Sequence, residues 1–158
     1  KSLNKNFIVM HTSEPGSPFS IILADITELE KSDLNEASVF TGCFSRAWRA
    51  GNKKAEVGIF KSSQIYKNAG MKTGTWGVAG AVKKVSVSLI LVLTKQSGIL
   101  RAVPEQSVKN KDHILLKIAP GKIDKKQAPL KLDFEIKEHF NNEEILQAIP
   151  AGGFKIIR

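Results

Sequence analysis

The run KVSVSLILVL, residues 84–93, constrains the fold of this chain more than any other segment. Its first half alternates between apolar and polar residues and its second half is wholly apolar, which is typical of a strand at the centre of a sheet. The apolar stretch over 85–94 carries serines and has about half the length that a helix needs to cross a bilayer. We therefore expect a globular fold built around a sheet, with no membrane association.

A helix is predicted before this strand, over roughly residues 33–50. Ser32 and Asp33 offer a start, and Asp33 with Glu36 has the spacing of a capping box. Gly51 marks the end, the usual role of glycine at that position. Apolar side chains recur between these limits at intervals of three and four residues, as one buried helical face requires: Leu34, Ala37, Phe40, Phe44 and Ala47.

Shorter apolar runs predict further strands, and a Ser97-Gly98 turn joins the central strand to the next one. The remaining strand candidates are 7–10, 19–25, 55–60, 99–103, 113–118 and 130–136. The fold class is α+β, with a mostly antiparallel sheet packed against one principal helix and a β-rich carboxy-terminal extension. We expect two parts, residues 1–104 and residues 105–158, the second of unknown role.

Charge is concentrated in the middle of the chain. The net charge is +9, and residues 46–84 alone hold nine Lys and Arg against one acid, Glu56. Favourable interaction with a helix dipole explains Arg46 and Arg49 at the helix end but not the lysines that follow. A concentrated basic block favours a polyanion as partner.

Two tryptophans lie in the same block and supply aromatic planes on which bases stack when they are exposed. Trp76, in the glycine-rich stretch AGMKTGTWGVAG, is the better stacking candidate. Trp48 neighbours the apolar helical stripe and is expected to pack the helix end. The glycines Gly74, Gly77 and Gly80 lack the spacing of a nucleotide-binding loop and predict a hairpin, although phosphate contacts through Lys72, Lys83 and Lys84 stay open.

Little in the sequence supports catalysis, a metal or a cofactor. One cysteine and three histidines argue against a zinc site, and the lack of DxD or ExxH pairs argues against a metal-dependent nuclease. His11 stands alone before a Pro-Gly loop, where a structural role is the commoner one. Cys43 is expected to be an inert buried thiol, and a single cysteine predicts a reducing, cytoplasmic compartment.

Four segments, in order, resemble the RNA-binding domain of the NFACT family, which includes fibronectin-binding-protein-A-like proteins and nuclear export mediator factors. HTSEPGSP is similar to the family's histidine and Pro-Gly loop, with His11, Pro15, Gly16 and Ser17 at its positions. LNEASVFTGCFSRAWRAG resembles the family helix, EVGIFKSSQIYK the strand after it, and KTGTWGVAGAVKK the glycine hairpin before a lysine pair. The resemblance covers roughly residues 6–93, and we interpret the chain as a stand-alone or excised form of that domain. Whether its amino end is missing stays undecided at this point.

The resemblance implies RNA binding, and for full-length relatives an engagement of stalled ribosomal subunits and tRNA. Together with the basic block, it predicts a non-enzymatic RNA-binding module near the ribosome or tRNA. The loop residues His11, Gly16 and Ser17 would add polar contacts and Trp76 a stacking contact. The predicted phosphate contacts are Arg46, Arg49, Lys53, Lys54, Lys72, Lys83 and Lys84.

Two alternatives remain at this stage. The basic block could dock an acidic protein partner, which would make the chain a protein-interaction module. A nuclease or phosphoesterase centred on His11 and the glycine-rich loop is the weaker alternative.

Overall fold

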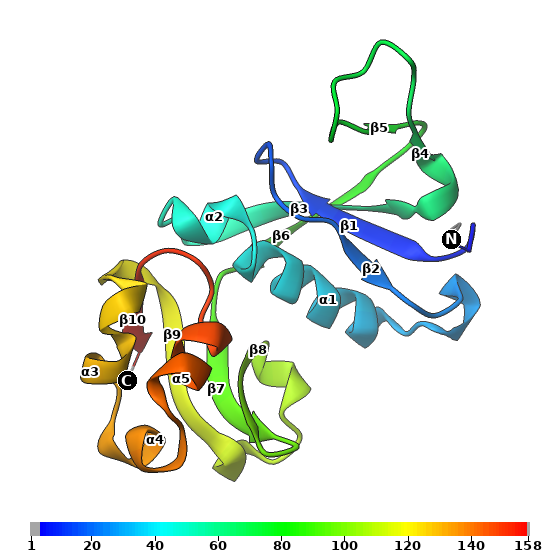
Figure 1. The fold of residues 1–158 in the computed structure, drawn as a ribbon. Coiled ribbons are helices and arrows are strands. Elements are labelled where there is room, and N and C mark those ends of the chain that lie inside the picture. Colours follow the sequence, from blue (N-terminus) through cyan, green and yellow to red (C-terminus); the bar gives the residue numbers. More distant parts are fainter. Residues whose placement is uncertain (1–3, 158) are drawn as a thin grey trace.

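The structure is a computed structural model that describes residues 4–157, and its strands form two four-stranded antiparallel sheets and a short hairpin (Figure 1). The first sheet has the order β2-β1-β3-β6, with β1 at Ile8–Thr12, β2 at Ser20–Ile22, β3 at Lys54–Lys61 and β6 at Lys83–Ser88. The second sheet has the order β10-β9-β7-β8, with β7 at Leu91–Gln96, β8 at Ile99–Val103, β9 at Ile114–Ile123 and β10 at Phe154–Ile157. The hairpin pairs β4, Ile65–Tyr66, with β5, Gly77–Val78.

Helices accompany both sheets, so the predicted α+β class is confirmed. The first half of the chain, which ends with β6 at Ser88, contains α1, Lys31–Cys43, and α2, Arg46–Arg49, with short 3-10 turns η1 at Ile26–Glu28 and η2 at Ser62–Gln64. The second half, which starts with β7 at Leu91, contains α3, Ala128–Lys131, α4, Phe134–His139, and α5, Asn142–Ala148. Its 3-10 turns are η3 at Glu105–Ser107, η4 at Lys111–His113 and η5 at Lys125–Gln127.

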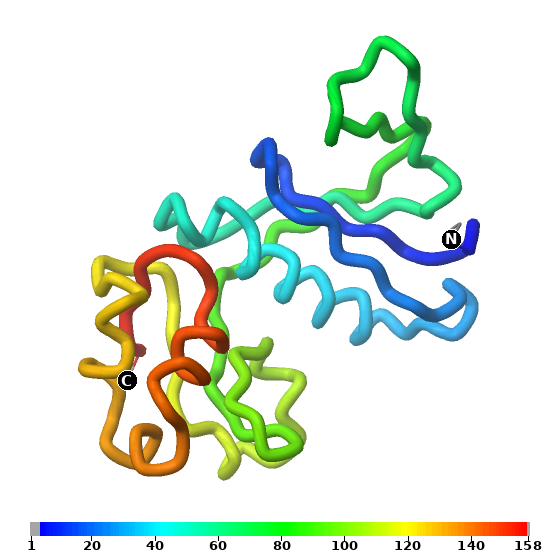
Figure 2. The backbone as a smooth tube through the Cα atoms, viewed as in Figure 1, coloured from blue at the N-terminus to red at the C-terminus, as the bar shows by residue number. Residues whose placement is uncertain are grey.

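The predicted central strand over 84–93 is in fact two strands that belong to different sheets. The chain leaves β6 at Ser88, passes Leu89 and Ile90, and enters β7 in the second sheet (Figure 2). The change of sequence pattern has this cause: β6 is an edge strand in which Val85 and Val87 face the core and the polar residues are exposed, whereas β7 lies inside its sheet and is buried over its first four residues. The second sheet contains β7 and β8, which precede residue 104, and β9 and β10, which follow it. The chain therefore passes from the first sheet to the second between Ser88 and Leu91.

The helix predicted over 33–50 is interrupted. Glu30 and Asp33, not Asp33 and Glu36, form the capping box of α1. Ser45 is extended and its hydroxyl accepts a hydrogen bond from the Ala47 amide at 3.1 Å, so it starts α2 as a new helix. Gly51 follows with φ of +79°, the left-handed conformation that ends a helix at a glycine.

The predicted apolar stripe is confirmed in part, because Ala47 is buried and Leu34, Ala37 and Phe44 pack against the core. Small and polar residues of α1 join them in the buried face. Ser38, Thr41, Gly42 and Cys43 are buried, whereas Phe40 is 42% exposed. The Ser38 hydroxyl donates to the Leu34 carbonyl at 2.6 Å, and a Cβ on Gly42 would lie only 2.8 Å from a Val87 methyl. At Gly42 the helix therefore approaches the sheet too closely for a larger side chain. Burial raises the pKa of Cys43 to about 12, in agreement with the inert thiol that we predicted.

The carboxy-terminal part is less rich in strands than expected. The strand predicted over 130–136 is wrong, because this segment runs from α3 into α4. Its apolar residues alternate, which suggested a strand, but Leu130 and Phe134 are exposed whereas Ala128, Leu132 and Ile136, spaced by four, are buried. Ala128 of α3, Leu132 at its end and Ile136 of α4 join the core, whereas Leu130 and Phe134 do not. The core is continuous across both halves and includes Trp48, Ile118 and Phe154.

The start of α2 provides a test of this local structure. Replacing Ser45 with alanine removes the acceptor for the Ala47 amide and the donor to the Gly42 carbonyl, both inside a buried junction. We expect the free energy of unfolding, from urea denaturation, to fall by about 1 to 2 kcal/mol. The control Ser32→Ala lies in the exposed first turn of α1 and should change the free energy of unfolding by less than about 0.5 kcal/mol. Equal stability of the two variants would contradict the role of Ser45 as a cap.

Candidate functional site

The first sheet has one face against α1 and a second face from which candidate side chains project. Successive side chains of a strand point to opposite faces, and Met10 of β1 faces α1, where the Ser38 hydroxyl lies 3.6 Å from its sulfur. Its neighbour His11 therefore projects from the other side, which we call the open face. The strand register places His11 opposite Gly58, and Gly58 opposite Lys84.

The loop between β1 and β2 joins this face to α2. His11 Nε2 lies 2.9 Å from the Ser17 carbonyl oxygen, and the Arg46 amide donates to the Ser17 hydroxyl at 3.2 Å. A Cβ on Gly16 would lie 2.9 Å from the central carbon of the Arg46 guanidinium, and Gly16 has φ of +79°. The guanidinium thus lies directly against the loop backbone. Four of the predicted site residues are brought together here.

An ion pair lies next to this loop. Lys84 Nζ is 2.8 Å from Glu56 Oε1, and the Ser13 hydroxyl donates to the same oxygen at 3.0 Å. The hydrogen bond from Lys84, followed by that from Ser13, lowers the pKa of Glu56 below its ordinary value. Lys54 projects from the same face as Glu56, two residues away on β3. The single acid of the basic block therefore offsets one of its cations.

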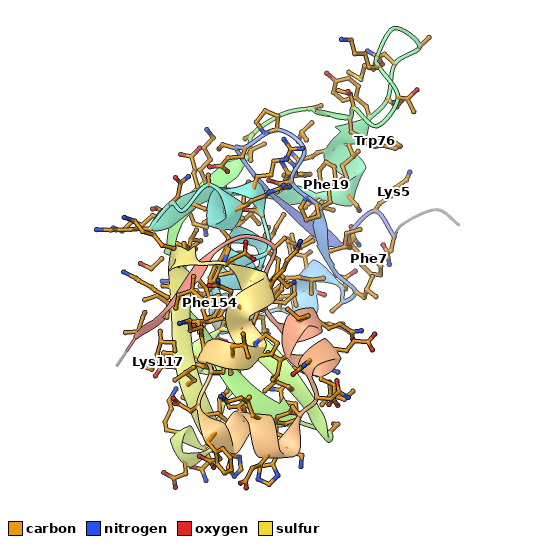
Figure 3. The ribbon with its side chains drawn as sticks, turned by 60° about the vertical axis from the view of Figure 1, so that its left-hand side comes forward. Lys5, Phe7, Phe19, Trp76, Lys117 and Phe154 are labelled. Carbon is orange, nitrogen blue, oxygen red and sulfur yellow. The ribbon has the colours of Figure 1, made fainter. Side chains whose placement is uncertain are left out.

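The far end of the open face is aromatic. The ring centroid of Phe19 lies 4.6 Å from that of His11 and 6.5 Å from that of Phe60. Phe19 and Trp76 are 40% and 51% exposed and lie in the same part of the molecule (Figure 3). Together with Val9, Ile21 and Ile65 they line an apolar hollow of about 170 Å³.

A lysine supports the loop that carries Trp76. Lys67 Nζ donates to the carbonyls of Lys72 and Thr75 at 2.9 and 3.0 Å, and lies 5.4 Å from the Trp76 ring centroid. This loop belongs to the β4–β5 hairpin, which projects from the sheet on the side away from the second half (Figure 1). Phosphate contacts by Lys72 would thus be remote from those by Arg46.

The other predicted lysines and Arg49 do not join this group. Lys83 projects from the α1 side of β6, where it shares a shallow hollow with Lys31. Lys53 lies in the exposed turn before β3. Arg49 contacts Gly152 in the second half of the chain. The predicted set is therefore divided among several surfaces.

Sequence analysis missed Phe19 as a site residue. The signal was present, because Phe19, Ile21 and Leu23 are apolar at every second position, and all three are at least 37% exposed. Residues 19–25 were predicted only as a strand, whereas β2 is an edge strand, which leaves these apolar side chains partly exposed.

Residues 4–157 contain no group of three or more His, Cys, Asp or Glu side chains that could hold a metal ion. Within the same range, no helix has both the length and the apolar character to cross a membrane. Trp48 is fully buried, which confirms the structural role expected for it.

Comparison with known proteins adds one relation. No protein-family model matches the chain, and no solved structure matches it. Among curated proteins, the archaeal Rqc2 homologue aRqcH of Methanocaldococcus jannaschii is 24% identical over 168 aligned residues. The match includes the whole of this chain, which spans about a quarter of the length of that protein. At the level of the family, this distant similarity supports a relation of the chain to NFACT proteins.

Proposed function

We propose that this chain is an RNA-binding module that acts in association with the ribosome or tRNA. The observation that carries the proposal is the Arg46 guanidinium, held against the backbone of Gly16 beside an open sheet face that also presents Lys84. The similarity to an Rqc2 homologue, a class of protein of ribosome quality control, supports the same function.

In this proposal the basic end of the open face contacts phosphates. The planar guanidinium of Arg46 suits bidentate hydrogen bonding to a phosphate. The loop residues His11, Gly16 and Ser17 fix the position of this guanidinium. Lys54 and Lys84 contribute further charge on the same face, and a phosphate competes with Glu56 for Lys84. Lys53 and Lys72 would make outlying contacts, whereas Lys83 lies on the other face of β6 and is left out.

The aromatic end of the face would bind bases. Phe19 and Trp76 both line the apolar hollow with partly exposed rings. Stacking of a base on such a ring contributes about 1 to 3 kcal/mol. We propose no catalytic role for His11, because its Nε2 is engaged by the Ser17 carbonyl and its ring packs on Phe19.

Binding of fluorescently labelled tRNA, titrated at several salt concentrations, tests the proposal. The double variant Arg46→Ala, Lys84→Ala should bind more weakly, and its slope of log K against log salt should be smaller by about 1.4 to 1.8, or 0.7 to 0.9 per phosphate contact. Glu56→Gln should act in the opposite direction and strengthen binding, because it releases Lys84.

The matched control is Lys109→Ala, Lys137→Ala, which removes the same charge from exposed positions in the second half. Failure of the wild-type chain to bind tRNA in a salt-dependent manner would overturn the proposal. Tighter binding of polyglutamate than of tRNA at equal salt would favour the protein-interaction alternative instead.

A further inference from the structure

A second basic hollow lies where α2 meets the second half of the chain. It measures about 890 Å³, and four cationic side chains line it: Arg49, Lys122, Lys125 and Lys126. Lys122, Lys125 and Lys126 follow one another at the end of β9 and in η5, whereas Arg49 comes from α2. The hollow is thus assembled from segments that are far apart in the sequence.

Close backbone packing brings Arg49 to these lysines. A Cβ on Gly152 would lie only 2.8 Å from the Arg49 Cα, so the loop before β10 packs directly on α2. On the other side of the hollow, Lys125 Nζ donates to the Ile149 carbonyl at 2.6 Å. Partial burial lowers the pKa of Lys125 somewhat from its ordinary value. Lys122 and Lys126 are exposed and available to a ligand.

Two acids also line the hollow, and both already have local partners. The Asp124 carboxylate caps η5 by accepting a hydrogen bond from the Lys126 amide at 2.8 Å. Glu143 Oε1 accepts a hydrogen bond from the Gln147 side chain at 3.1 Å. Four cations against two acids leave the hollow with a positive charge, which attracts an anion.

We infer that this hollow binds phosphate groups of the RNA that the open face also contacts, so that the RNA crosses α2 from one half of the molecule to the other. The inference rests on the proposed function. Arg46 and Arg49 are three residues apart and therefore neighbours on the helix surface. They reach different loops, since Arg46 lies against Gly16 and Arg49 against Gly152. The carboxy-terminal part, for which the sequence indicated no role, would thus extend the RNA-binding surface.

The chemistry of the hollow favours RNA over an acidic protein. Protein interfaces depend on large buried anchors, commonly aromatic side chains or arginine in a well-packed pocket. Here the apolar lining consists of Leu146 and Ala151, which offers little for such an anchor. A phosphate chain needs only positive charge at intervals along its path.

The test is the salt dependence of tRNA binding by Lys122→Ala, Lys126→Ala, compared with the control double variant at Lys109 and Lys137. All four lysines are exposed, and α4, which carries Lys137, lies at the end of the second half away from α2 (Figure 1). We expect the slope of log K against log salt to fall by about 1.4 to 1.8 for the hollow variant and to fall less for the control.

The outcomes separate this inference from the proposed function. Unless the hollow variant loses more slope and affinity than the control, the inference is wrong, while salt-dependent binding by the wild-type chain would still support the proposed function. Loss of polyglutamate binding in the hollow variant, with tRNA binding unchanged, would also overturn it and assign the hollow to an acidic protein. Circular dichroism of each variant confirms that the comparison is made between folded proteins.

Discussion

Replacing Trp48 with alanine is expected to lower the free energy of unfolding by about 3 to 5 kcal/mol, the range for truncating a large buried aromatic side chain. Trp48 is fully buried, and its cluster includes Met10 of the first sheet and Phe154 of the second. The cavity left by the indole would therefore open in the core that the two halves share. Urea denaturation followed by far-ultraviolet circular dichroism measures the change.

Two further variants identify the cause of the loss. Trp76→Ala removes the same side chain from a half-exposed loop position and should cost far less stability. Trp48→Phe keeps much of the apolar volume and removes an indole N–H for which the described residues offer no hydrogen-bond partner, so its cost should lie between the other two. If Trp48→Ala were no more destabilising than Trp76→Ala, the placement of Trp48 in the shared core would be wrong.

Most elements could be predicted from local sequence patterns, because the conformation of a turn or a helix start depends on residues that are adjacent in the sequence. The Ser97-Gly98 turn is an example, since both residues have positive φ and join β7 to β8 as expected. The passage from β6 to β7 could not be predicted in this way. Residues 84–93 read as one strand, and only the pairing of β6 with β3 and of β7 with β9 shows that they serve two sheets.

The sequence indicated which residues are candidates for the site, but not which of them lie on the same surface. Arg46, Gly16 and Ser17 were each predicted to contact RNA, and the structure brings them into contact with one another. Lys83 and Lys84 were expected to act together, but adjacent residues of a strand point to opposite faces, so only Lys84 projects from the open face. The contact of Arg49 with Gly152 depends on the packing of segments about a hundred residues apart, which no local pattern reveals.

That same contact gives the second large effect. Gly152 has φ of +120°, a conformation that strains residues with a side chain, and an added Cβ would also meet the Arg49 backbone at 2.8 Å. Strain and overpacking each cost about 1 to 3 kcal/mol. We therefore expect Gly152→Ala to lower the free energy of unfolding by about 2 to 4 kcal/mol in urea denaturation.

Gly51 provides the matched control for this prediction. It also has positive φ, +79°, but nothing lies within 4 Å of the Cβ that alanine would add. Gly51→Ala should thus incur the backbone strain alone, about 1 to 2 kcal/mol. The excess loss in Gly152→Ala combines the greater strain at φ of +120° with the close packing of the loop on α2, and an equal loss would contradict that packing. Since the same packing holds Arg49 beside Lys122, folded Gly152→Ala protein should also show a smaller salt slope in tRNA binding than Gly51→Ala.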